Sequence, residues 1–198
     1  MLGNDIIDIT EARRTSNWQR KGFLDKVFSS HEQKEIEESL NPFYLVWRLW
    51  SMKESAYKVS IQSGLERSFN PSSIQCTIIS SEVGLISIGG LSLYSETKVS
   101  EDYILSLVNT INTAKITTKV LKIPAQNLHM QKEVLHQQIL GKVSTEYNYD
   151  KDDLSIQKTN LNVPYISHKN KKIASHISIS HHGKFAVFSL NSNLNSKK

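Results

Sequence analysis

A carboxylate and an ammonium group lie four positions apart, at Glu54 and Lys58, within residues 43–60, a segment without glycine or proline. Aromatic and aliphatic residues recur through this segment at helical spacing, which predicts an α-helix of about five turns. Side chains four residues apart share one helix face, so the two charged groups would be neighbours. On an exposed helix such a pair is an ordinary surface salt bridge. Beside Trp50 and Tyr57 the face would be partly buried, where an acid needs a cation or a metal ion to stay ionised.

A second acid, Asp5, lies in residues 2–9, a short isoleucine-rich segment that predicts a buried strand. If this strand packs against the helix, Asp5 and Glu54 would form an all-oxygen site. Hard oxygen ligands of this kind suit a Mg²⁺ ion that holds a phosphate group. Asp8 would point to the opposite face of the strand from Asp5, so it is the weaker candidate.

A polar pair, Ser180 and His181, ends an alternating run of residues near the C-terminus. The runs on either side of this pair predict two strands of a hairpin with polar residues at its tip. A histidine at such a tip is commonly structural or simply exposed. A metal site made from His176, His181 and His182 is disfavoured, because adjacent histidines on a strand point apart.

The remaining pattern predicts an α+β fold with two similar halves, each an antiparallel sheet packed with a long helix. Further strands are expected at residues 74–80, 85–90, 91–98, 103–108, 154–157 and 164–166, and further helices at residues 32–40 and 126–147. Ser30 and Gln33 resemble a capping box for the first of these helices, and Pro124 opens the second helical region. We expect residues 1–125 to carry the metal-binding strand and the WSMKES helix, and residues 126–198 to carry the SISH hairpin.

The composition is typical of a folded, soluble protein of 198 residues, with 38% hydrophobic and 22% charged residues. Cys76 is the only cysteine, so neither a disulfide nor a cysteine metal cluster can form within one chain, and we expect a cytoplasmic location. Asp5 and Asp8 interrupt the region where a signal peptide would be apolar. No apolar stretch approaches the roughly 20 residues that span a bilayer, so we expect no membrane association.

The net charge of +5 would suit nucleic acid, a membrane surface or an acidic protein partner. The positive residues are scattered and do not alternate with aromatic residues, as they would on a nucleic-acid platform. We therefore expect no nucleic-acid partner. If the protein did bind nucleic acid, its affinity would fall steeply with salt concentration and would not change when magnesium is removed.

Three segments together resemble the 4'-phosphopantetheinyl transferase superfamily. They are residues 3–9 (GNDIIDI), residues 50–58 (WSMKESAYK) and residues 177–181 (ISISH). They are similar to the family's glycine-x-aspartate segment, its W-S-x-K-E-A-x-x-K helix and its S-x-S-H segment. Weaker likenesses are Ala186-Val187 for the strand after S-x-S-H, Pro164-Tyr165 for a G-K-P-like turn, and residues 28–32 for an F-T-x-x-E segment. Ser55 departs from the pattern, since the family has alanine at this position.

The resemblance implies a Mg²⁺-dependent transfer of 4'-phosphopantetheine from coenzyme A to a serine of an apo acyl or peptidyl carrier protein. It implies that Asp5 and Glu54 are the metal ligands and that Lys58 contacts a phosphate of coenzyme A, with Glu54 and Lys58 as the catalytic residues. Lys53, Ser180 and His181 would bind the substrate. The general base is left open between Glu54 and a metal-bound water. Glu32 would either join the site or complement the dipole of its helix.

The order of the motifs resembles that of the small trimeric holo-acyl-carrier-protein synthases, although this chain is longer. The extra length predicts that both halves of the site lie in one chain, with the cleft between them; a site between subunits is the alternative. We expect a monomer or a small homo-oligomer. Exposed positive residues such as Arg13, Arg14, Lys21 and Lys26 are candidates for docking an acidic carrier. The motifs do not distinguish fatty-acid, polyketide and peptide carriers. The alternative function is a non-catalytic coenzyme A or nucleotide-binding homologue.

Overall fold

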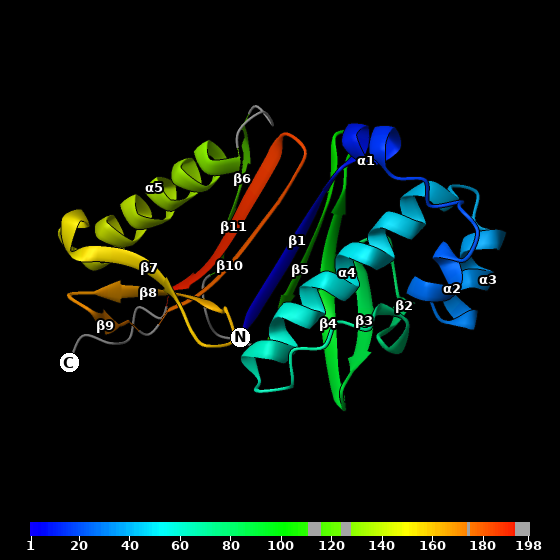
Figure 1. The fold of residues 1–198 in the computed structure, drawn as a ribbon, viewed down its shortest axis with the longest axis horizontal. Coiled ribbons are helices and arrows are strands. Elements are labelled where there is room, and N and C mark those ends of the chain that lie inside the picture. The colour runs from blue at the N-terminus through cyan, green and yellow to red at the C-terminus, as the bar shows by residue number, and fades with distance from the viewer. Residues whose placement is uncertain (111–115, 124–127, 174, 193–198) are drawn as a thin grey trace.

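The computed structural model describes residues 1–110, 116–123, 128–173 and 175–192. Figure 1 shows two α+β halves side by side. The first contains β1 (Leu2–Asp8), α1 (Ile9–Thr15), α2 (Phe23–Val27), α3 (Ser30–Glu38), α4 (Pro42–Gln62), the 3₁₀ turn η1 (Pro71–Ser73), β2 (Gln75–Ile78), β3 (Val83–Ile88), β4 (Leu91–Val99) and β5 (Tyr103–Asn109). The second contains β6 (Ile116–Lys122), α5 (Leu128–Tyr147), η2 (Lys151–Asp153), β7 (Leu154–Lys158), β8 (Pro164–His168), β9 (Lys171–Lys172), β10 (Ser175–His182) and β11 (Phe185–Ser192).

In the first half, five antiparallel strands form one sheet in the order β1-β5-β4-β3-β2. The strands expected at residues 74–80, 85–90, 91–98 and 103–108 are confirmed as β2 to β5, an antiparallel meander in which each strand pairs with the next. Helix α4 lies across one face of this sheet (Figure 1) and buries Val46, Leu49, Met52, Ala56 and Val59 completely. These residues recur at the three- and four-residue spacing that places them on one helix face. The helix extends beyond the predicted residues 43–60 at both ends: Pro42 occupies its first turn, where a missing N–H costs nothing, and its last turn continues to Gln62.

The second half places α5 over β10, β11 and β6, which form one antiparallel sheet, while β7, β8 and β9 form another. The predicted α+β class is confirmed, but the strands here form two three-stranded sheets instead of one. The helix was expected from residue 126; it begins at Leu128, and residues 124–127 lie outside the described residues. Within the described ranges no helix is long and apolar enough to cross a membrane.

The pairing of strand β6 bears on where the boundary between the two halves lies in the sequence. This strand lies before residue 126, yet it pairs with β11 along its whole length. Strand pairing joins residues about 70 positions apart here, a relation that local periodicity does not reveal. We therefore propose that the boundary lies between β5 and β6 instead of at residue 125.

Strand β1 lies at the seam between the halves, with β5 on one side and β10 and β11 on the other (Figure 1). Its side chains alternate, as those of every strand do. Gly3, Asp5 and Ile7 face α4, whereas alternate residues face the second half: Ile6 packs with Phe185 and Val187 there. Both faces are covered, so the polar residues of this strand, Asn4, Asp5 and Asp8, need partners within the protein.

Asp8, the last residue of β1, links the two halves at that end of the seam and is 2% exposed. Its side chain accepts hydrogen bonds from the backbone N–H groups of Glu11 at 3.1 Å and Lys184 at 3.0 Å. Its own N–H donates to Nδ1 of His182 at 2.9 Å. The pKa of His182 is lowered, chiefly by burial, so the ring stays neutral and available as an acceptor. Asp8 therefore caps α1 and holds the hairpin tip, and it faces away from Asp5 as predicted.

Gly3 is the point at which β1 runs closest to α4. A Cβ atom at this position would overlap the carbonyl oxygen of Ser55 and would lie 3.1 Å from Val59. The hydroxyl of Ser55 has acceptors in the carbonyls of Ser51, at 2.8 Å, and Ser106, at 3.1 Å. A serine in place of the family's alanine therefore fits here, whereas glycine is required opposite it.

We predict that Gly3→Ala lowers the free energy of unfolding by about 2 kcal/mol or more, because backbone atoms of α4 cannot move aside as a flexible side chain would. The matched control is Gly141→Ala in α5, where an added Cβ meets nothing within 4 Å. That substitution is expected to stabilise the protein by up to about 1 kcal/mol. Urea unfolding of both variants measures the difference, and equal effects would contradict the close approach of β1 to α4.

Candidate active site

A cavity of about 950 Å³ opens between the two halves of this single chain. Asp5, Glu54 and Lys58 line it from the first half, and Ser180 and His181 line it from the second. Five of the six residues predicted to carry the site thus meet at one cavity. The sixth, Lys53, does not. A volume of this size is at the upper end of the range for small-molecule sites, which suits a large ligand.

Lys58 projects from α4 across the edge of β1. Its ammonium group donates to the carbonyl of Asn4 at 2.6 Å and to the carbonyl of Ile179 at 3.5 Å, and it lies 3.7 Å from Oδ1 of Asp5. The side chain is 28% exposed, so the charge faces the cavity while its position is fixed by both halves. An ammonium group held in this way can stabilise negative charge on a bound ligand.

Asp5 and Glu54 place two acids beside this lysine. The hydroxyl of Ser51 donates to the carbonyl of Asp5 at 3.0 Å, which holds this part of β1 to α4. Burial raises the pKa of Asp5 to about 7; Lys58 opposes this shift, and the charge of Glu54 adds to it. Burial also raises the pKa of Glu54, again against Lys58. The two carboxylates therefore lie where negative charge is poorly compensated.

The donor set fits a Mg²⁺ ion held by two protein carboxylates. Oδ2 of Asp5 is buried and has no hydrogen-bond partner among the described residues. A divalent cation would supply that partner and would favour the ionised form of both acids. No cluster of three acidic, histidine or cysteine ligands occurs in the described ranges, so the remaining ligands would come from substrate phosphate and water.

The opposite wall carries Ser180 and His181 at the end of β10. Ser180 is 7% exposed, and its hydroxyl donates to Oδ1 of Asn4 at 3.2 Å. His181 is exposed at the cavity. The turn before β8 also reaches the cavity through Asn162, Val163 and Pro164, the segment that resembles a G-K-P turn. Both features lie where a nucleotide entering the cavity would meet them.

Sequence reasoning missed a basic wall of the same cavity. Its residues are Arg67, His129, Lys132, His136 and Lys158. The pKa of His136 is lowered, first by burial and then by the charges of Lys132 and Lys158, which lie close to its ring. One signal was present in the sequence, since His129, Lys132 and His136 recur at the three- and four-residue spacing of one helix face.

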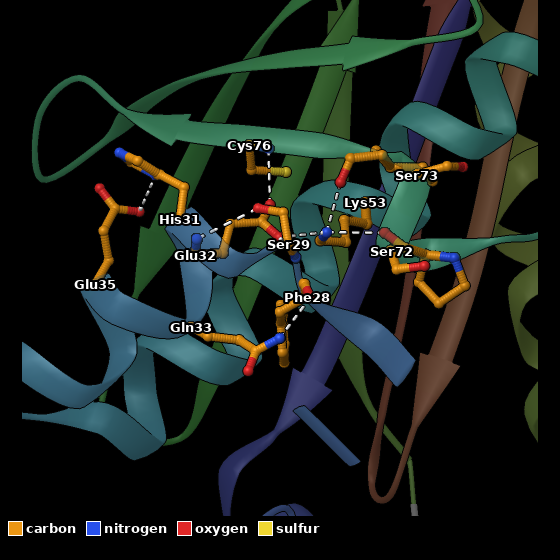
Figure 2. Close-up of polar contacts among 12 residues, drawn as sticks. Phe28, Ser29, His31, Glu32, Gln33, Glu35, Lys53, Ser72, Ser73 and Cys76 are labelled. Carbon is orange, nitrogen blue, oxygen red and sulfur yellow. Dashed lines mark hydrogen bonds and ion pairs between the residues drawn. The ribbon is translucent and has the colours of Figure 1, made fainter. Parts of the chain in front are cut away.

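The prediction that Lys53 contacts the substrate is wrong. Its side chain is fully buried, and its ammonium group bonds to Glu32 at 2.7 Å and to the carbonyls of Pro71 and Ile74 at 2.8 and 2.5 Å (Figure 2). The physical reason is helical geometry: Lys53 follows Leu49 by four residues and precedes Ala56 by three, so it lies on the buried face of α4.

Glu32, the partner of Lys53, lies outside the cavity lining and has every acceptor engaged. Oε2 accepts from the N–H of Ser29 at 2.8 Å, and Oε1 accepts from the N–H of Cys76 at 2.8 Å (Figure 2). Ser29 accepts in turn from the N–H of Glu32, so the capping box is formed by Ser29 and Glu32 and not by the predicted Ser30 and Gln33. Glu32 therefore fixes the start of α3 and of β2.

We predict that Lys53→Met lowers the free energy of unfolding by about 3–5 kcal/mol, because it leaves the Glu32 carboxylate buried without a cation. The control is Lys58→Met, on the same helix, which should cost less than half as much because Lys58 is partly exposed. Chemical denaturation compares the two, and the double variant Lys53→Met/Glu32→Gln should recover part of the loss. Similar costs for the two lysines would contradict the assignment of Lys53 to the core.

The fold and the cavity describe an α+β protein whose cleft combines a carboxylate pair, an ammonium group and a basic wall. The sequence model of the 4'-phosphopantetheinyl transferase superfamily matches residues 1–108, more than half of the 198 residues, and the chain belongs to this superfamily. Its members use coenzyme A as substrate and act on carrier proteins. The comparison with curated proteins gave no match at the required significance. The second half lies beyond the matched residues.

Proposed function

We propose that this chain transfers the 4'-phosphopantetheine group of coenzyme A to a serine hydroxyl of an apo carrier protein. The observation that carries the proposal is the meeting of Asp5, Glu54 and Lys58 with Ser180 and His181 at one cavity, although the two groups are separated by more than 100 residues of sequence. Membership of the superfamily supports the reaction class.

In the proposed reaction the carrier serine oxygen forms a bond to the β-phosphorus of coenzyme A. The bond from that phosphorus to the bridging oxygen breaks, and adenosine 3',5'-bisphosphate leaves with the electron pair. Lys58 stabilises the charge that develops on the phosphate oxygens. Glu54 would take the serine proton as the general base. Lys58 bonds to backbone carbonyls of both halves, and this link would help to keep nucleophile and leaving group aligned.

Asp5 and Glu54 would hold a Mg²⁺ ion, which supplies charge neutralisation for the pyrophosphate when it is bound. The orphaned Oδ2 of Asp5 supports this assignment. Ser180 and His181 would face the nucleotide phosphates from the opposite wall, with His181 as the hydrogen-bond donor. Lys132 and Lys158, on the basic wall, would attract the remaining negative charge of coenzyme A.

We further propose that the carrier docks over the basic surface that follows β1. Arg13, Arg14, Lys21 and Lys26 are all exposed. The guanidinium of Arg13 lies 4.4 Å from the centre of the Phe43 ring, which orients it, whereas Arg14 is partly neutralised by Glu11 at 2.7 Å. An acidic carrier helix would therefore find its strongest fixed positive charge at Arg13.

The first prediction from this proposal is a gain of one phosphopantetheine in the mass of an apo carrier incubated with the protein, coenzyme A and Mg²⁺. Glu54→Gln and Lys58→Met should lower the rate at least about 100-fold, because each removes a charge that acts at the phosphate. Lys34→Met is the matched control, since Lys34 is 73% exposed and outside the cavity lining. Intact mass spectrometry with fatty-acid, polyketide and peptide carriers also identifies the preferred class. Tight binding of coenzyme A without product from any carrier would favour a non-catalytic homologue.

The second prediction concerns the metal alone. Mg²⁺ at about ten times its dissociation constant should stabilise the folded protein by about 1.4 kcal/mol. Asp5→Asn and Glu54→Gln should lose this stabilisation, whereas Asp25→Asn, at an exposed acid of α2, should keep it. Thermal unfolding with and without Mg²⁺ measures the shift. An equal shift in wild type and Asp5→Asn would refute the proposed metal site without bearing on the binding of coenzyme A.

A further inference from the structure

Asn4 is a fully buried polar residue in the middle of the seam, and all its polar atoms are engaged. Its backbone N–H donates to Oγ of Ser178 at 2.9 Å. Its amide nitrogen donates to the carbonyl of Ser178 at 3.1 Å and to Oγ of Ser189 at 2.8 Å. Its Oδ1 accepts from the hydroxyls of Ser178 at 3.1 Å and Ser180 at 3.2 Å. One side chain thus contacts two strands of the second half.

The same residue contacts groups that line the cavity from both halves. Its carbonyl accepts the 2.6 Å hydrogen bond from Lys58, and its Oδ1 holds Ser180 on the facing wall. The next residue in the chain is Asp5, the proposed metal ligand. Among the residues that the structure describes, Asn4 therefore links three groups of the site: it bonds to Lys58 and Ser180, and it is joined to Asp5 by a peptide bond.

The amide group is suited to this place because it combines two donors with an oxygen that accepts twice. An aliphatic side chain of similar size would fill the space, but it would leave buried hydroxyl and carbonyl groups without partners. The network continues from Ser189 to Thr118 of β6 at 3.0 Å, so it crosses the whole three-stranded sheet. Fully satisfied networks of this kind fix one arrangement of the groups they join.

We propose that Asn4 is a positioning residue that sets the spacing between the two walls of the cleft and thereby the affinity for coenzyme A. The proposal rests on the proposed function. It assigns no contact between Asn4 and the substrate; the residue acts through Ser180 and Lys58.

The test compares Asn4→Leu with the matched control Ser189→Ala. Both remove a hydrogen bond between Asn4 and Ser189, but only the first releases Ser180, and Ser189 does not line the cavity. Isothermal titration with coenzyme A should show a dissociation constant about tenfold higher for Asn4→Leu, as expected for the loss of one or two buried hydrogen bonds, and a change within about twofold for Ser189→Ala. Ser180→Ala added to Asn4→Leu should weaken binding no further, because the two residues act in one chain of contacts.

Equal affinity of wild type and Asn4→Leu, or equal losses in Asn4→Leu and Ser189→Ala, would overturn the positioning role. Asn4→Thr replaces the amide with a hydroxyl, which can still donate and accept a hydrogen bond, and threonine suits a strand. This variant guards against misfolding of the leucine variant and should recover part of the affinity. A wild-type protein that binds no coenzyme A would instead overturn the proposed function, and the positioning role with it. Wild-type binding without transfer leaves the affinity comparison decisive for Asn4.

Discussion

The structure depends on strand β1, whose free edge needs hydrogen-bond partners and whose two faces both need to be covered. The strand pairs with β5 on one side only, and an unpaired strand edge normally invites association with another chain. Here side chains take the place of a neighbouring strand: Lys58 covers the carbonyl of Asn4, and Ser178 covers its N–H. The groups that protect the edge are the same groups that form the cleft. The same side chains therefore both protect the edge of β1 and line the cavity.

The two lysines of the motif helix show how burial divides similar residues between structure and chemistry. Lys53 and Lys58 are five residues apart, which rotates them by about 140° around the axis of α4. Lys53 meets a carboxylate and two carbonyls in the core and has no solvent exposure. Lys58 meets two carbonyls and keeps an open side toward the cavity. A fully paired buried charge is inert, whereas an incompletely paired one is available to a phosphate.

Much of this arrangement could be predicted from residue spacing, because the spacing of residues along a helix or strand determines which side chains share a face. The long helix, the meander and the divergence of Asp5 from Asp8 all follow from periods of 3.6 and 2. The same periods also put Lys53 on the face of Leu49 and Ala56, which is the buried face of α4. The place of β6 could not be found in this way, since its pairing with β11 is a contact between distant segments. The spacing of His129, Lys132 and His136 indicates that they share one helix face, but not that this face lines the cavity.

Asn4 was missed for a different reason. Asn4 stands beside Asp5 in a short strand that also contains Asp8, and its sequence neighbours reveal none of its side-chain partners, which lie 174 to 185 positions away. Such a residue is costly to bury unless every polar atom is paired. The cost is offset here by hydrogen bonds that exist only when the two halves meet in one register. Ile6, which follows Asn4 by two residues, packs against Phe185. This apolar contact has no preferred direction, so by itself it would let one half slide along the other. Directional bonds at Asn4 remove that freedom at the point where the two walls of the cleft must face each other.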